Sequence, residues 1–260
     1  LRSYPRVVGE TGGKDFIVAH PDCDRRALLV AMLRGSFEFQ GQKCSAASRA
    51  YVPQSVWDAI EADYCEEVSK ITMGDPRDFS NFMTAVIDRK SFDNITGYID
   101  RAKADSGCKI VTGGGYNDSV GYFIEPTTIV CEDPRYESMA EEIFGPVLSV
   151  HVYPDNDFEK ILEICDSTSE YALTGSIFAK DRRHIETAMA ALRYSSGNFY
   201  INDKPTGAVV GQQPFGGARG SGTNDKAGSP LNLLRWVSPR SIKETFAPPH
   251  DWTYGFHSEP

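Results

Sequence analysis

The segment from residue 147 to residue 202 alternates between strand and helix patterns, and this alternation constrains the fold more than any other feature. Strand-forming residues occupy 147–153, 174–179 and 198–202. Between them, apolar residues recur at helical spacing, at Phe158, Ile161, Leu162 and Cys165 and then at Ile185, Ala188, Met189 and Leu192. The order β-α-β-α-β predicts an α/β fold whose parallel sheet has right-handed crossovers. In such sheets we expect the loops at the carboxyl ends of the strands to carry the chemistry.

The rest of the chain also contains strand and helix patterns. Strands are expected at 6–8, 15–20, 50–52 and 109–112, and again on both sides of Pro126 within 122–130. Helices are expected after an Asp22 or Asp24 cap, after Pro53, and around 92–102. The Gly113-Gly114-Gly115 run lacks a phosphate-binding motif, so a hairpin turn is the better interpretation.

Charge and composition exclude several classes of partner. The 260 residues carry a net charge of −9 with no basic cluster, which argues against nucleic acid and against an anionic membrane surface. The longest apolar run, 27–33, is too short to span a bilayer. The six cysteines form no C-x-x-C pair, and the five histidines lack zinc-site spacing. We therefore expect no metal site and a reducing compartment.

The first residue, Leu1, is not a methionine, and no signal or transit segment precedes the first expected strand. This favours a fragment or an excised domain. At the other end, a glycine-rich loop over 207–222 leads to an apolar stretch and then to a proline-containing tail, 238–260. We expect this tail to be an edge strand or an arm that leaves the globule and contacts another subunit.

Cys44 is the first candidate for chemistry. It follows the Gly41-Gln42-Lys43 turn at the end of a helix-patterned stretch, among small and polar residues. A reactive thiolate needs a positive, partly exposed site, and a nearby carboxylate is able to activate a water. Glu10, in the glycine-rich loop 9–14, would supply that carboxylate. The alternatives are a buried, unreactive cysteine and a glutamate that caps a turn.

Four motifs stand in one order along the chain: 10–14 (ETGGK), 41–44 (GQKC), 141–146 (EEIFGP) and 214–217 (PFGG). This order resembles the catalytic half of the NAD(P)-dependent aldehyde dehydrogenase family, over essentially the whole chain. The segments 198–204, 206–207, 211–219 and 221–226 further resemble the mitochondrial branch of this family that oxidises L-glutamate γ-semialdehyde.

The resemblance implies a covalent mechanism. Cys44 would attack the aldehyde carbon to give a thiohemiacetal, and hydride transfer to NAD+ would leave a thioester. Glu10 would be the general base for hydrolysis of the thioester. The backbone N–H of Cys44 would stabilise the oxyanion, while Gln42 would be structural.

The resemblance also implies the binding residues. Glu142 would hold the nicotinamide ribose hydroxyls of NAD, and Phe144 would pack against the nicotinamide. The α-carboxylate of a small amino-acid aldehyde would be anchored by Ser45 and by the backbone amides of Gly207 and Ala208. Phe215 would flank the aliphatic chain of the substrate.

The domain expectations follow from the same resemblance. Residues 1–237 would form the catalytic domain, with 205–237 also readable as a junction to the cofactor domain, and 238–260 would be an oligomerisation arm or flap of a homodimer. The NAD-binding domain would lie outside this chain, so the chain alone should not reduce NAD+. The implied location is the mitochondrial matrix.

Three alternative functions remain open. They are a dehydrogenase for another aldehyde, a cofactor-free cysteine esterase, and an inactive assembly fragment.

Overall fold

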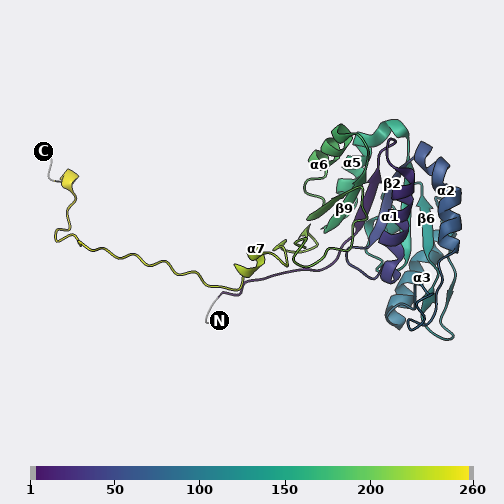
Figure 1. Cartoon of the computed structure of the whole chain (residues 1–260), viewed down its shortest axis with the longest axis horizontal. Helices are drawn as coiled ribbons and strands as arrows, with labels where there is room; N and C mark the ends of the chain where they lie inside the picture. The colour runs from purple at the N-terminus through teal and green to yellow at the C-terminus, as the bar shows by residue number, and fades with distance from the viewer. Residues whose placement is uncertain (1–3, 258–260) are drawn as a thin grey trace.

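A computed structural model describes residues 4–257. Its centre is a seven-stranded sheet in the order β10-β9-β1-β2-β7-β6-β3 (Figure 1). All neighbouring strands are parallel except β3, which is antiparallel to β6. The predicted α/β fold with a mainly parallel sheet is therefore confirmed. The strands are β1 (Asp15–Ala19), β2 (Ala47–Pro53), β3 (Cys108–Thr112), β6 (Thr127–Cys131), β7 (Val147–Tyr153), β9 (Thr174–Phe178) and β10 (Asn198–Ile201).

Helices cover both faces of this sheet (Figure 1). The helices α1 (Arg25–Phe37) and α2 (Gln54–Ser69) pack on one face. The helices α3 (Arg89–Ala104), α5 (Phe158–Ser167) and α6 (Arg182–Ala191) pack on the other. Smaller elements complete the chain: β4 (Tyr116–Asn117), β5 (Phe123–Ile124), β8 (Tyr171–Ala172), β11 (Ala218–Arg219), α4 (Glu137–Ala140), α7 (Pro230–Leu233), η1 (Glu38–Gly41), η2 (Asp155–Asp157) and η3 (Gly255–His257).

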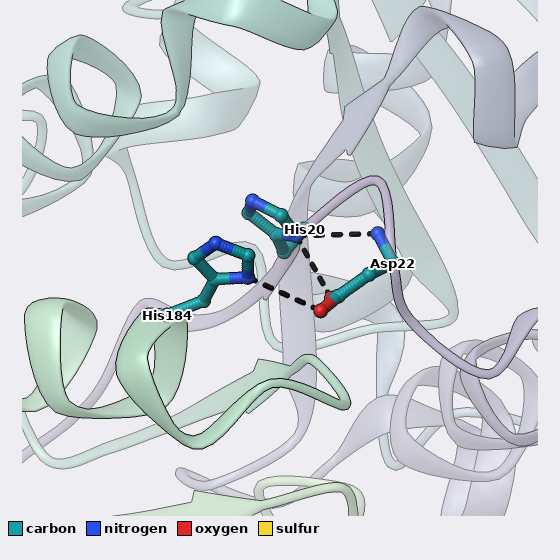
Figure 2. Close-up of side chains that lie close together, drawn as sticks. All are labelled: His20, Asp22 and His184. Carbon is teal, nitrogen blue, oxygen red and sulfur yellow. Dashed lines mark hydrogen bonds and ion pairs between the residues drawn. The ribbon is translucent and has the colours of Figure 1, made fainter.

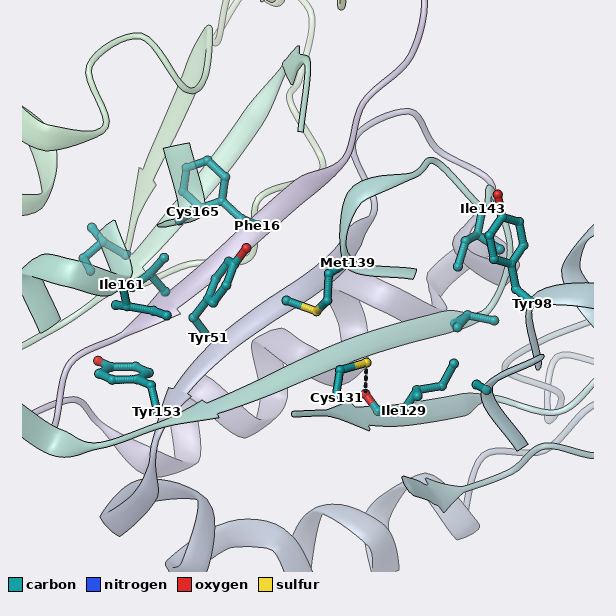
Figure 3. Close-up of a cluster of buried hydrophobic side chains, with 14 of the residues drawn as sticks. Phe16, Tyr51, Tyr98, Ile129, Cys131, Met139, Ile143, Tyr153, Ile161 and Cys165 are labelled. Atoms are coloured by element: carbon teal, nitrogen blue, oxygen red, sulfur yellow. Dashed lines mark hydrogen bonds between the residues drawn. The ribbon is translucent and has the colours of Figure 1, made fainter. Parts of the chain in front are cut away.

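The alternation of side chains along each strand divides the core into two clusters. In β1, Phe16 and Val18 face the α3, α5 and α6 side, where Tyr51 and Ile161 also lie (Figure 3). Ile17 and Ala19 face the opposite side and pack against α1 and α2. Because both faces are buried, the strands are mostly apolar, as expected for a covered parallel sheet, although Asp15 in β1 and Arg49 in β2 are buried charged residues.

Local signals place the helix ends. The Asp24 side chain accepts a hydrogen bond from the backbone N–H of Ala27 at 3.0 Å, so Asp24 is the cap of α1. Asp22, the other candidate, does not cap α1, and its carboxylate accepts hydrogen bonds from the backbone N–H groups of Lys180 and Asp181. Pro53 occupies the N-cap of α2, where its missing N–H is not needed. In α6, Ile185 is buried, but Met189 is 41% exposed. The buried face of this helix is therefore narrower than the face that its apolar residues predict.

Both ends of the described chain lie outside the sheet. The strand predicted at 6–8 is wrong, since Val7 and Val8 are exposed and form no strand. They lie instead beside the α7 segment, where the Arg235 guanidinium donates to the carbonyl of Val7 at 2.8 Å. The described part of the tail, 238–257, is exposed and extends away from the globule (Figure 1). No helix within residues 4–257 has both the length and the apolar character to cross a membrane.

Candidate active site

The predicted catalytic side chains lie at the amino edge of the sheet. The loop with Glu10 enters β1, the loop with Cys44 enters β2, and the loop with Glu142 enters β7. Because these strands are parallel neighbours, the loops that enter them meet at one edge. The loops with Glu10, Cys44 and Glu142 thus precede their strands and do not lie at the carboxyl edge, where we expected the chemistry. The predicted substrate loop is different, because Gly207 and Ala208 follow β10.

Glycines allow these loops to approach one another closely. A Cβ atom on Gly13 would lie less than 3.0 Å from the carbonyl oxygen of Cys44. Gly41 has a φ of +65°, and a Cβ there would collide with the carbonyl of Gly145. Residues from all three loops line one small hollow that includes Glu142. The glycines of the sequence motifs are thus the contact points that assemble the site.

The environment of Cys44 is negative. Its thiol is half-buried, and burial together with the charges of Asp15, Glu10 and Glu142 raises its pKa to about 11. The two predicted partners, Glu10 and Glu142, therefore act electrostatically on the same sulfur. Lys43 does not offset them, because its ammonium pairs with the carboxylate of Glu38 at 3.2 Å.

The Glu10 loop is held by the glycine-rich segment near the end of the globule. Glu10 forms an isolated antiparallel bridge with Gly222. The backbone N–H of Thr11 donates to the carbonyl of Ser221 at 3.1 Å, and that of Thr223 donates to the carbonyl of Gly9 at 3.0 Å. The carboxylate of Glu10 itself is exposed, as a base that must reach a water requires.

Glu142 is positioned by the Glu10 loop. Its Oε1 atom accepts a hydrogen bond from the backbone N–H of Gly13 at 2.9 Å. Burial raises the pKa of this half-buried carboxyl group, and the Gly13 N–H and the Lys14 charge oppose the rise. Within residues 4–257 the second oxygen, Oε2, has no hydrogen-bond partner. This half-open carboxylate fits the predicted role of accepting two ribose hydroxyls.

Phe144 stands two residues further on in an unusual conformation. Its φ is +58°, a region that costs energy for a bulky residue, and its ring is 42% exposed. A ring held outside the core at this cost is available to stack on a ligand. Packing in the core does not describe this ring.

Ser45 contacts the predicted substrate loop directly. Its Oγ lies 2.8 Å from the Oγ1 of Thr206, and both residues are buried. Gly207, the next residue, has a φ of +94°. Within the described residues no group accepts from the backbone N–H of Gly207 or Ala208, so both donors are open to an anion.

A second link joins the same two loops. The Glu38 carboxylate accepts from the ammonium of Lys204 at 2.6 Å and from that of Lys43 at 3.2 Å. Lys43 precedes Cys44, the predicted nucleophile, and Lys204 precedes the predicted substrate loop. Glu38 lies outside the sequence motifs, and Thr206 lies in one of the matching segments, but the links that both residues make depend on partners distant in sequence.

Phe215 and Gln42 have clear structural roles. Phe215 is half-buried and exchanges backbone hydrogen bonds with Ala227 at 3.0 and 2.7 Å. The Asn198 side chain fixes its loop by donating to the carbonyl of Pro214 at 2.9 Å. No hydrogen bond within 4–257 joins Phe215 to the Cys44 loop. Gln42 accepts from the backbone N–H of Ile87 at 2.9 Å.

Lys14 and Asp15 are two buried charged residues whose environment was not anticipated. Burial lowers the pKa of Lys14 to about 7 and raises the pKa of Asp15 to about 8. Asp15 accepts from the backbone N–H of Thr174 at 2.6 Å, and the Arg49 guanidinium binds the carbonyl of Lys14 at 2.8 Å. A hydrophobic strand pattern hides such residues, although a charged pair at a strand entrance is a usable signal.

The comparisons with known proteins agree with this geometry. Residues 2–242 match the aldehyde dehydrogenase family, and the chain belongs to that family. A mitochondrial Δ1-pyrroline-5-carboxylate dehydrogenase of Dictyostelium discoideum is 58% identical over 259 residues, covering 100% of this chain and 46% of the relative. The human mitochondrial enzyme of the same name is 51% identical, covering 98% and 46%.

A solved structure shows the same fold. The Δ-pyrroline-5-carboxylate dehydrogenase of Mycobacterium tuberculosis bound with NAD is 53% identical, with a TM-score of 0.90 over 98% of this chain and 46% of that one. The chain thus spans about half the length of the relatives that it matches.

Proposed function

We propose that the whole protein oxidises L-glutamate γ-semialdehyde, the open form of 1-pyrroline-5-carboxylate, to L-glutamate with NAD in proline catabolism. One observation carries the proposal: the Cys44, Glu10 and Glu142 loops converge at one edge of the sheet, beside the Ser45–Thr206 contact. A nucleophile, a base, a cofactor carboxylate and an anion-binding loop are the parts that this reaction needs.

The chemistry of the chain's own residues follows in two stages. The Cys44 thiolate forms a C–S bond to the aldehyde carbon, and the carbonyl oxygen takes up the negative charge near the Cys44 N–H. NAD, when bound, would supply the hydride acceptor, so the carbon attached to Cys44 would lose a hydride, its C=O would form again and a thioester would remain on Cys44. Glu10 then takes a proton from a water, the water oxygen attacks the thioester, and the C–S bond breaks to release the carboxylate.

NAD fits the residues present. The Oε2 of Glu142 is unpaired among the described residues, and Phe144 is exposed in a strained conformation beside it. In the Mycobacterium tuberculosis relative, NAD is bound. Glu142 would bind the ribose hydroxyls and Phe144 would orient the nicotinamide over Cys44.

The amino-acid end of the substrate would lie on the second loop. The free N–H groups of Gly207 and Ala208 would bind the α-carboxylate, with Ser45 and Thr206 holding that loop against Cys44. Phe215 would pack against the aliphatic chain. Residues 1–237 would be the catalytic domain, and it would work together with an NAD-binding domain of the whole protein.

The arm, 238–260, would pair two subunits of a homodimer. Relatives of this chain are named as mitochondrial, and we place the whole protein in the mitochondrial matrix.

The test compares substrates with the whole protein. NADH formation should be much faster with glutamate γ-semialdehyde than with aliphatic aldehydes of similar length, and Cys44→Ala should abolish it. Equal rates with both kinds of aldehyde would refute the proposed substrate. Ester hydrolysis that depends on Cys44 without any response to NAD would refute the dehydrogenase itself.

A further inference from the structure

The carboxyl edge of the sheet, opposite to the Cys44 loop, carries a second cluster of functional side chains (Figure 2). His20 directly follows β1, Asp22 lies in the same connection, and His184 is in the first turns of α6. One ligand atom from each lies within 4.8 Å of the others. The cluster therefore joins the connections that leave two neighbouring strands, β1 and β9.

The donor atoms converge on one carboxylate. The Nδ1 of His20 lies 2.8 Å from Oδ1 of Asp22, and the Nδ1 of His184 lies 3.1 Å from Oδ2. Neighbouring ligands around a first-row divalent ion, with bonds of about 2.1 Å, are separated by roughly 3 Å. Without an ion, ring N–H protons hold the same groups together by hydrogen bonds, so metal binding would displace protons.

The backbone fixes this arrangement. The N–H groups of Lys180 and Asp181 donate to the Asp22 carboxylate at 3.2 and 2.9 Å, which prevents it from turning away. The backbone N–H of His20 donates to the carbonyl of Phe178 at 2.8 Å. Such supporting contacts are what metal sites require around their ligands. Side-chain exposures of 14% for His20, 29% for Asp22 and 36% for His184 leave a path for an ion.

We propose that His20, Asp22 and His184 form a binding site for a divalent transition-metal ion. Two imidazoles and one carboxylate suit zinc, cobalt or nickel better than calcium or magnesium. This departs from the expectation of no metal site, which was based on the spacing of histidines along the sequence. Because the cluster and Cys44 lie at opposite edges, the ion would clamp the β1–α1 connection to α6 and stabilise the fold without entering the reaction.

The test uses the full chain without a polyhistidine tag. It also carries Cys44→Ser, so that the thiol of the candidate active site cannot bind the added metal. Competition with a chromophoric chelator gives the affinity for Zn²⁺ and Co²⁺, and the visible spectrum of bound Co²⁺ reports the ligand type. We expect one ion per chain, no thiolate charge-transfer band, and a metal-dependent rise in melting temperature.

The variants locate the ion. His184→Ala should lower the affinity at least about tenfold and remove the rise in melting temperature, while His250→Ala, in the exposed arm, should change neither. Circular dichroism checks that each variant is folded, and His184→Gln replaces any variant that is not. An unchanged affinity in the folded His184 variant, a thiolate charge-transfer band, or no binding at micromolar metal would overturn the proposal.

Discussion

The hydroxyl of Ser45 lies 2.8 Å from the hydroxyl of Thr206, across 161 residues of sequence. This buried contact joins the Cys44 loop to the loop whose Gly207 and Ala208 N–H groups have no acceptor among the described residues. Under the proposed function, the position of the aldehyde carbon relative to the α-carboxylate would depend on this contact.

Ser45→Ala should impair recognition of the amino-acid end more than the chemistry. The change leaves the Thr206 hydroxyl buried without its partner, which costs about 1–3 kcal/mol. In the whole protein we expect the KM for glutamate γ-semialdehyde to rise roughly tenfold and the kinetics with aliphatic aldehydes to change little. Ser69→Ala, on the exposed end of α2, is the control. Equal losses with both kinds of aldehyde would remove the proposed role in anchoring.

Glu142→Gln should weaken cofactor binding. The amide oxygen still accepts from the Gly13 N–H, so the loop keeps its position, but the charge that two ribose hydroxyls would meet is lost. We expect the Kd for NAD to rise about tenfold in a titration of the whole protein. Glu141→Gln is a matched control, because the neighbouring carboxylate binds the hydroxyl of Tyr98 instead. A Kd that shifts equally in both variants would contradict the assignment.

The rate of alkylation of Cys44 in this chain should increase with pH as expected for a thiol with a pKa of about 11. Burial and three carboxylates disfavour the thiolate, so removing one negative charge lowers the pKa and raises the rate at a fixed pH. Glu10→Gln should speed iodoacetamide labelling at neutral pH roughly two- to fivefold, a pKa change of ~0.3–0.7. Glu159→Gln, exposed on α5, should have no effect. Peptide mapping confirms the labelled site, and a wild-type thiol that titrates below about 8.5 would contradict this electrostatic description.

Asp15 should make the stability of the chain fall as the pH rises. Burial raises its folded pKa to about 8 from 3.8, so the folded state holds a proton that the unfolded state has lost between these values. The stabilisation is complete below pH 3.8 and disappears as the pH approaches 8.

Between pH 5 and 6, Asp15→Asn should remove a slope of at most ~1.4 kcal/mol per pH unit in the free energy of unfolding. Urea unfolding at several pH values measures this slope. Lys14 has a folded pKa of about 7, so it is largely protonated in both states only up to about pH 6, and the slope is read between pH 5 and 6. Asp93→Asn, on the exposed surface of α3, should leave the slope unchanged. A wild-type slope of the opposite sign would contradict the burial argument.

Most of the fold was predictable from sequence, because the sheet is covered on both faces and its elements alternate regularly. The strand over 147–153 and the two helices that follow it appear where their periodicity predicts. The strand expected at 6–8 failed for a physical reason. Val7 and Val8 have strand-forming side chains, but the chain there lies beside α7 and not against the sheet.

The sequence motifs predict Cys44, Glu10 and Glu142 as site residues, and the structure brings their three loops together. The edge at which these loops meet was not predicted, because the general rule favours the carboxyl edge and they lie at the amino edge. The links made by Thr206 and Glu38 could not be predicted, because they depend on how distant loops fold together. The burial of Lys14 and Asp15 was not predicted either, since burial is a property of the packed sheet.

Trapping the covalent intermediate tests the central claim most directly, namely that Cys44 is the nucleophile and Glu10 the base. The whole protein with Glu10→Gln is mixed with NAD and glutamate γ-semialdehyde, and the intact mass and the peptide map are measured after rapid quenching. Because hydrolysis lacks its base, we predict one NADH per site in a burst and a thioester adduct on the peptide that contains Cys44. No adduct, or an adduct on another residue, together with undiminished steady turnover, would contradict the account.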